Sequence, residues 1–199
     1  MSNDSDGEIL QIQENAALIV IDVQKGFDDP SLQGKRNNIE ADRNIEAIIK
    51  VWENAKRPVV VVQHNSISEG SVLNPKKPGN SLKPYVQQVN PALLVTKSVN
   101  SAFYGMPDLD KWLKSSDIHQ IVIIGIQTNM CCETTARMAG NLGYDVIFVP
   151  DAMHTFDATG PDGCVVSADD ITRATVASLF DGDFAKIAST EKILVSGGK

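Results

Sequence analysis

The sequence predicts an α/β fold: a doubly wound, six-stranded, mainly parallel sheet in the order 3-2-1-4-5-6, with helices on both faces. Two observations support this fold class. Short apolar runs that are continuous rather than alternating are typical of strands buried on both faces. These runs alternate along the 199 residues with longer segments of helical periodicity. Such an alternation implies right-handed crossovers between parallel strands.

Each expected element has a local pattern in the sequence. The expected strands are Ala16–Ile21, Val59–Val62, Ala92–Val95, Gln120–Ile124, Asp145–Val149 and Lys186–Ala188. The expected helices are Asn38–Asn54, Asp108–Lys114, Met130–Asn141 and Ala168–Phe180. In the first of these helices, apolar side chains recur at helical spacing, as at Ile45, Ile48 and Trp52. Gly143 is placed to end the third helix.

The chain length allows one domain with a full hydrophobic core and is too short for two. We expect a single domain over residues 13–195, between flexible tails at residues 1–12 and 196–199. The formal net charge is -7, and an acidic surface repels nucleic-acid phosphates and anionic lipid. Neither nucleic acid nor membrane is therefore an expected partner, and the apolar runs are too short to span a bilayer.

Cysteine content and the N-terminal composition bear on the cellular compartment. The first ten residues, MSNDSDGEIL, lack the basic start and the apolar centre of a secretory signal. Of the three cysteines, Cys131 and Cys132 are adjacent and Cys164 lies alone in a loop-like stretch. This arrangement is a poor disulfide framework, so the sequence predicts a reduced, cytoplasmic protein.

Three reactive residues, Asp22, Lys97 and Cys131, follow three different expected strands. In an open parallel sheet, ligands bind outside the carboxyl ends of the strands, where the strand order reverses. Taken singly, these residues can be a loop cap, an exposed lysine and a packed cysteine. Together they would supply a base, a cation and a nucleophile. Cys131 would also lie in the first turn of its helix, where the helix dipole and a nearby ammonium stabilise a thiolate.

At these residues the sequence resembles the isochorismatase-like cysteine hydrolases, a superfamily that includes nicotinamidases and N-carbamoylsarcosine amidohydrolase. The matching residues are Asp22, Gln24 and Phe27 after the first strand, Lys97 and Ser101-Ala102-Phe103 after the third, and Gly125, Thr128, Cys131, Thr135 and Ala136 around the nucleophile. The resemblance runs from about Ala16 to Leu194, which is nearly the whole chain.

The resemblance implies hydrolysis of a small amide, ureide or carbamoyl compound through a thioester acyl-enzyme. Asp22, Lys97 and Cys131 would be the catalytic residues, with Asp22 as the base. Members of the superfamily commonly form dimers or tetramers, so a homodimer or homotetramer is expected.

The resemblance also distinguishes the two adjacent cysteines. Cys131, three residues after Thr128, takes the nucleophile position, and Cys132 falls where the family usually has Val. Cys132 is therefore expected to be a packed apolar side chain. A cis peptide is implied before Gln127, and the backbone N–H groups of Gln127 and Cys131 would form the oxyanion hole.

The sequence departs from the nicotinamidase branch at the metal site. Those enzymes carry an Asp-x-His pair after the second strand and another His downstream. The corresponding stretch here is Gln63-His64-Asn65-Ser66, and the next histidine is His119. One histidine without carboxylate partners does not make a divalent-metal site. We therefore expect no metal and no cofactor, and nicotinamide is not the expected substrate.

Substrate contacts are expected from side chains around the crevice at the strand ends. They are Gln24, Phe27, His64, Phe103, Tyr104 and His154. Phe27 is interpreted as a pocket wall because it lies in the loop after Asp22. For His64 and His154 the alternative is a loop residue that is hydrogen-bonded to the backbone. Phe103 and Tyr104 belong either to the pocket or to the core.

Two other functions are compatible with the sequence. One is an isochorismatase that cleaves a vinyl ether and releases pyruvate; because that reaction does not require cysteine, Cys131 argues for the amidohydrolase. The other is a non-enzymatic role as a redox-responsive thiol protein or a partner-binding subunit, because an activated thiolate is readily oxidised.

Overall fold

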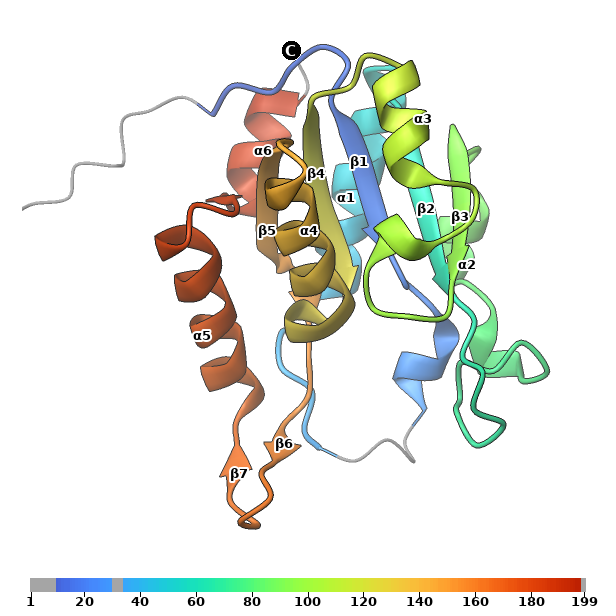
Figure 1. The fold of residues 1–199 in the computed structure, drawn as a ribbon, viewed down its shortest axis with the longest axis vertical. Coiled ribbons are helices and arrows are strands. Elements are labelled where there is room, and N and C mark those ends of the chain that lie inside the picture. The colour runs from blue at the N-terminus through green and yellow to red at the C-terminus, as the bar shows by residue number, and fades with distance from the viewer. Residues whose placement is uncertain (1–9, 30–33, 198–199) are drawn as a thin grey trace, which may run out of the picture.

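A six-stranded parallel sheet forms the centre of the computed structural model, which describes residues 10–29 and 34–197. Its strands are β1 (Ala17–Ile21), β2 (Val59–His64), β3 (Leu93–Lys97), β4 (Gln120–Ile126), β5 (Asp145–His154) and β8 (Lys186–Ile187). The spatial order is β3-β2-β1-β4-β5-β8, and all five pairings between neighbours are parallel (Figure 1). This confirms the predicted fold class and strand order, with β8 as the sixth strand.

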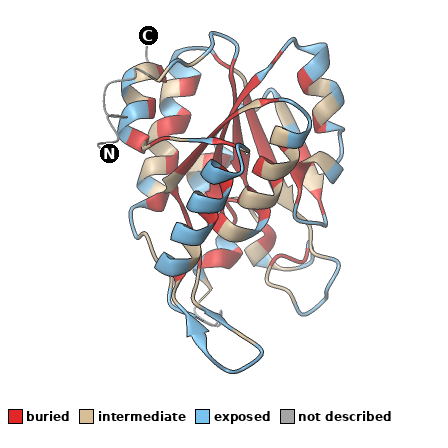
Figure 2. Ribbon diagram, turned by 60° about the vertical axis from the view of Figure 1, so that its left-hand side comes forward, coloured by how far each residue is buried: buried red, intermediate tan, exposed pale blue. Residues whose placement is uncertain are grey.

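Helices cover both faces of the sheet. On one face α1 (Ala41–Asn54), the short α2 (Pro84–Gln87) and α6 (Thr190–Gly197) contribute side chains to one core cluster. On the other face α3 (Leu109–Ser115), α4 (Glu133–Asn141) and α5 (Ala168–Asp181) contribute to a second cluster. Every residue of β1 and β4 is buried, and Figure 2 shows buried residues along the strands with exposed residues on the outer helical surfaces. The continuous apolar runs thus reflect burial on both sides.

Several elements differ from the expected boundaries. β5 continues past Val149 to His154, because its pairing with β4 resumes after a register shift between Ile123 and Gly125. In the sequence, Pro150 and Asp151 interrupt the apolar run of this strand. α1 begins at Ala41 rather than Asn38, because Asn38 has a φ of 40° and is outside the helical region. The expected helix Met130–Asn141 is divided into a π-helical turn, Thr128–Cys132, followed by α4.

The short α2, a hairpin and the last helix were missed entirely. A short antiparallel hairpin, β6 (Ala158–Thr159) with β7 (Val165–Val166), extends from the end of β5 and is exposed (Figure 1). The helix α6 starts at Thr190, whose N–H and hydroxyl both donate to the carboxylate of Asp151. That anchor comes from β5, 39 residues earlier, so local sequence does not reveal it.

Both expected tails lie partly outside the described residues. Residues 1–9 and 198–199 are not described. Leu10 and Ile12, assigned to the N-terminal tail, pack against the core cluster of α1. Gly197, assigned to the C-terminal tail, is a buried residue of α6, and its carbonyl accepts a hydrogen bond from Arg57. Within the described part of the chain, no helix combines the length and apolarity needed to cross a membrane.

Candidate active site

The carboxyl ends of β1, β2 and β3 bring three polar side chains together. Asp22 directly follows β1, and its N–H donates to the carbonyl of Val62 in β2. His64 and Lys97 are the last residues of β2 and β3 and are paired in the register of those strands. Asp22 has a φ of 50°, a left-handed conformation that aspartate tolerates better than most residues. This bend turns Asp22 out of the regular alternation of β1.

Gly125 allows β4 to carry the nucleophile segment close to Asp22. Its φ is 134°, and a Cβ at this position would lie 2.1 Å from the carbonyl oxygen of Ile21. No side chain fits between the two strands at that point, so only glycine permits this approach. The turn that follows β4 holds Cys131 above the central strands.

The ammonium group of Lys97 lies at the centre of the resulting cluster. Its Nζ is 2.6 Å from Oδ2 of Asp22, 3.2 Å from Sγ of Cys131 and 3.1 Å from Nδ1 of His64. The side chains of Lys97 and Asp22 are both fully buried. An ammonium has three hydrogens and no acceptor, so these three partners satisfy it completely.

Asp22 is left with one carboxylate oxygen that has no partner. Oδ1 is buried and has no hydrogen-bond partner among the described residues. Burial raises the pKa of Asp22, although the charge of Lys97 opposes the rise. Burial also opposes the charge of Lys97, but Asp22 and Cys131 hold the pKa of Lys97 above its ordinary value. Asp22 is thus a stronger base than an exposed aspartate and has a free oxygen to accept a proton.

The pKa of Cys131 differs from what its position near a helix start suggests. Burial and the nearby charge of Asp22 raise the pKa of the Cys131 thiol to about 12, and Lys97 only partly offsets them. The helix start and Lys97 were expected to stabilise a thiolate, and burial together with Asp22 outweighs them, which favours the thiol. Burial outweighs the helix N-terminus here, because Cys131 is only 8% exposed.

The hydrogen bond with Lys97 fixes the protonation of His64. Because an ammonium can only donate, Nδ1 of His64 must be the acceptor, which leaves the proton of the neutral ring on Nε2. Burial and the charge of Lys97 lower the pKa of His64, and this favours the neutral ring. His64 is half-buried and is the last residue of β2, so it lies in the strand rather than in the loop that was expected after Val62.

The turn between β4 and α4 has the backbone that the resemblance implies. The Ile126–Gln127 peptide is cis, as expected. The single hydroxyl hydrogen of Thr155 donates to Oδ1 of Asn129 at 2.5 Å, and Oε1 of Gln127 lies farther away, at 3.4 Å. Sequence reasoning missed Asn129 and Thr155, and the position of Asn129 between Thr128 and Cys131 is the signal that could have found it.

The remaining motif residues connect elements around the site. Oγ1 of Thr135, in α4, accepts a hydrogen bond from the N–H of Ala102 at 3.1 Å. Ser101 accepts one from the N–H of Phe103 and caps the short helix that follows Lys97. Cys132 is fully buried in the core beside α4, which confirms that it is a packed side chain.

Gln24 and Phe27 are packed rather than open to a crevice. Gln24 is fully buried; its amide donates to the carbonyls of His64 and Asn80 and accepts from the N–H of His64. Gln24 therefore positions the end of β2 through the backbone. Phe27 is 8% exposed and belongs to the core cluster on the α1 side, and its interpretation as a pocket wall stays a prediction.

His154, Phe103 and Tyr104 occupy three different environments. His154 is fully buried in β5 between Phe27 and Phe156, and neither ring nitrogen has a partner among the described residues. Burial lowers the pKa of His154 to about 3, so the ring is neutral. Phe103 stacks on Tyr144 at 5.9 Å, and Tyr104 is 71% exposed.

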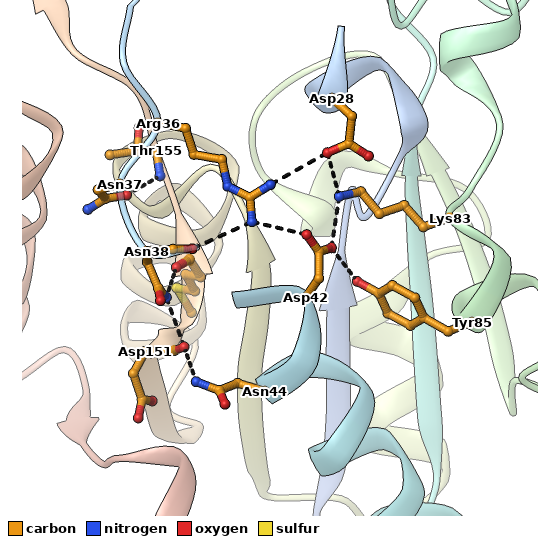
Figure 3. A network of polar contacts seen from close by, with 11 residues as sticks. Asp28, Arg36, Asn37, Asn38, Asp42, Asn44, Lys83, Tyr85, Asp151 and Thr155 are labelled. Atoms are coloured by element: carbon orange, nitrogen blue, oxygen red, sulfur yellow. Dashed lines mark hydrogen bonds and ion pairs between the residues drawn. The ribbon is translucent and has the colours of Figure 1, made fainter. Parts of the chain in front are cut away.

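A second buried lysine, which sequence reasoning missed, lies beside the start of α1. Nζ of Lys83 is 2.8 Å from carboxylate oxygens of both Asp28 and Asp42. Arg36 donates to both carboxylates, and the hydroxyl of Tyr85 donates to Asp42 (Figure 3). We call these five residues the Lys83 network. Its members come from separate loops and helices, so no local sequence motif predicts it.

The active-site cluster also contains a set of atoms that could ligate a metal ion. One ligand atom each from Asp22, His64 and Cys131 lies within 4.8 Å of the others. His64 has no carboxylate partner near it in the sequence, and the fold supplies Asp22, which directly follows β1. Lys97 lies among these atoms, so the expectation of no catalytic metal stays a prediction.

The fold and this cluster define a doubly wound α/β protein with a polar site at the carboxyl ends of its parallel strands. The model of the isochorismatase domain matches residues 16–178, and the chain belongs to the isochorismatase family.

Individual relatives cover nearly the same extent. The isochorismatase family protein YrdC of Bacillus subtilis (strain 168) is 37% identical over 183 residues, covering 92% of this chain and 96% of that protein. Nicotinamidase 3 of Arabidopsis thaliana is 29% identical, covering 89% and 86%. A crystal structure of an isochorismatase family protein from Chromobacterium violaceum ATCC 12472 superposes with a TM-score of 0.88 at 31% identity, covering 96% and 98%.

Proposed function

We propose that the protein is a cysteine-dependent hydrolase of a small amide, ureide or carbamoyl compound, acting through a thioester on Cys131. One observation carries the proposal: the buried Lys97 ammonium contacts both the Asp22 carboxylate at 2.6 Å and the Cys131 sulfur at 3.2 Å. This arrangement puts a base, a cation and a nucleophile within one hydrogen-bonded group. The nicotinamidase relative is named for the hydrolysis of an amide.

The first step transfers the thiol proton during attack. Cys131 rests as a thiol because its pKa is raised to about 12, so the nucleophile forms only when a base removes the proton. The free Oδ1 of Asp22, whose pKa burial raises, is the proposed acceptor. As Asp22 becomes neutral, Lys97 stays charged and stabilises the negative charge that develops on sulfur.

The second half of the cycle reverses the proton transfer. Protonated Asp22 donates to the leaving amine or ammonia as the C–N bond breaks, which leaves an acyl group on Cys131. Asp22 then accepts a proton from the water that hydrolyses the thioester. The backbone N–H groups of Gln127 and Cys131 are the proposed oxyanion donors, and one such donor contributes about 3–4 kcal/mol in other enzymes.

Substrate contacts are proposed for the half-buried and exposed side chains around this cluster. His64 would present its Nε2–H to an acceptor such as a substrate carbonyl, because its Nδ1 is used by Lys97. Tyr104 is exposed and free to contact a ligand, whereas Gln24 is bonded to backbone. Assembly as a dimer or tetramer and a cytoplasmic location remain part of this proposal.

The proposal is tested by ammonia release from a panel of amides, ureides and carbamoyl compounds. Cys131→Ala should abolish turnover, and acid-quenched wild type should carry the acyl group of its substrate on Cys131 in mass spectrometry. Cys164→Ser removes an exposed cysteine and is the matched control that should keep full activity. Turnover by the Cys131→Ala variant would contradict the mechanism. Rapid alkylation or oxidation of Cys131 without turnover of any compound would favour the redox role.

A further inference from the structure

The Lys97 ammonium occupies the position that a metal ion would take among its neighbours. It is in contact with one oxygen, one nitrogen and one sulfur, from Asp22, His64 and Cys131, at 2.6, 3.1 and 3.2 Å. Carboxylate, neutral imidazole and thiolate are the ligand types that zinc selects. The cation at the centre of this set is supplied by the protein itself.

The geometry points to a concealed site for a thiophilic divalent cation of the zinc class, formed by Asp22, His64 and Cys131 and filled in the native protein by the Lys97 ammonium. Nothing beyond these four side chains is needed for the inference. Because Lys97 fills the site in the native protein, the inference does not depend on the proposed hydrolase activity.

The separation of the three ligand atoms is compatible with zinc. They lie within 4.8 Å of one another. Tetrahedral zinc holds sulfur, nitrogen and oxygen ligands about 3.3–3.6 Å apart, given its bond lengths of about 2.0–2.3 Å. The three side chains would therefore close by roughly 1 Å around the ion. Three protein ligands leave the fourth position to water, as in zinc sites that are open to solvent.

Each of the three side chains either has a lone pair available for a metal ion or gains one by losing a single proton. Nδ1 of His64 carries a lone pair, because it accepts from Lys97. Asp22 has its second oxygen, Oδ1, unpartnered among the described residues. Cys131 would release its thiol proton to solvent when it binds the ion, so affinity should rise with pH.

Lys97 prevents this binding in the native protein by charge and by position. A divalent ion and an ammonium a few ångströms apart repel each other strongly, and the side chain of Lys97 is fully buried, so water screens the repulsion little. Truncating Lys97 should therefore vacate the centre and convert the active site into a metal site.

The test is metal binding by the Lys97→Ala variant, with Zn²⁺ measured by calorimetry and Co²⁺ by its thiolate charge-transfer absorption. We expect one ion per chain, bound at least about 100-fold more tightly than by wild type, because the competing charge is gone. Adding His64→Ala should weaken binding, and adding Cys131→Ser should remove the thiolate absorption. These readouts do not depend on turnover, so they can fail or succeed independently of the hydrolase proposal.

Lys83→Ala is the matched control. It also removes a buried lysine and leaves two carboxylates, but no cysteine contacts that network, so Co²⁺ should show no thiolate absorption. Circular dichroism checks that each variant is folded, and Lys97→Ser carries the same test if Lys97→Ala is not. Zinc affinity equal to that of wild type, or unaffected by His64→Ala, would overturn the inference.

Discussion

Two buried lysines, Lys97 and Lys83, are each paired with carboxylates, and their surroundings differ in one respect. Lys83 contacts two carboxylates that are 30% and 50% exposed, and Asp42 receives further hydrogen bonds from Arg36 and Tyr85. Lys97 contacts a single, fully buried carboxylate whose second oxygen has no partner among the described residues. The Lys–Asp pair in the Lys83 network thus has a fully hydrogen-bonded carboxylate, whereas the Lys97–Asp22 pair has a carboxylate oxygen that can still accept a hydrogen bond.

The pKa values of the two aspartates follow this difference. Burial opposes ionisation of Asp42, but hydrogen bonds from Lys83 and Tyr85 lower its pKa to about 2. Burial raises the pKa of Asp22 despite the contact with Lys97. A carboxylate that accepts several hydrogen bonds stays ionised and has a structural role. A buried carboxylate with an oxygen that accepts no hydrogen bond has a raised pKa and can exchange a proton. A structural ion pair therefore differs from a reactive one in how completely the carboxylate oxygens are hydrogen-bonded, more than in the presence of a lysine.

The largest expected effect is on catalysis at Asp22. Asp22→Asn removes the proposed base and should lower kcat by about 10²–10⁴-fold, the usual contribution of a general base. Asp42→Asn, the same change in the Lys83 network, should leave kcat within a few-fold of wild type. Steady-state kinetics on any substrate found in the panel measures both. Equal losses in the two variants would show that the two lysine sites do not differ in the way proposed.

The second effect is on folding stability at Lys83. Lys83→Met removes a buried cation and leaves Asp28 and Asp42 as neighbouring like charges. Breaking a fully buried pair costs about 3–5 kcal/mol, and because these carboxylates are partly exposed we expect about 1–3 kcal/mol. Urea denaturation measures the free energy of unfolding, and the folded variant should keep wild-type turnover. An unchanged free energy of unfolding would contradict the anchoring role.

The smallest effect is a dependence of that stability on pH. Asp42 has a folded-state pKa of about 2, below the ordinary value of 3.8, so its ionised form favours folding. The advantage of wild type over Asp42→Asn should be complete above about pH 5 and should shrink as the pH falls toward 2. Denaturation of both proteins across this range measures it. A difference that grows on acidification would mean that the pKa of Asp42 is raised instead.

Much of the fold can be predicted from the sequence, because parallel strands that are buried on both faces have continuous apolar runs. The strands Ala17–Ile21 and Gln120–Ile126 are buried at every residue and almost wholly apolar because helices cover both faces. The end of β5 and the start of α6 lack such a signature. Their positions depend on a register shift against β4 and on the bond between Asp151 and Thr190, which are distant in sequence.

By itself, the sequence determined the sheet, its strand order and the convergence of Asp22, Lys97 and Cys131, because the carboxyl ends of parallel strands meet at one edge. Only the tertiary structure decided that Gln24 binds backbone, that His154 is sealed in the core, and that His64 completes the contacts of Lys97. It also decided that Cys131 rests as a thiol. Residue type and spacing specify which groups arrive at the site, whereas burial and the count of available donors set their protonation.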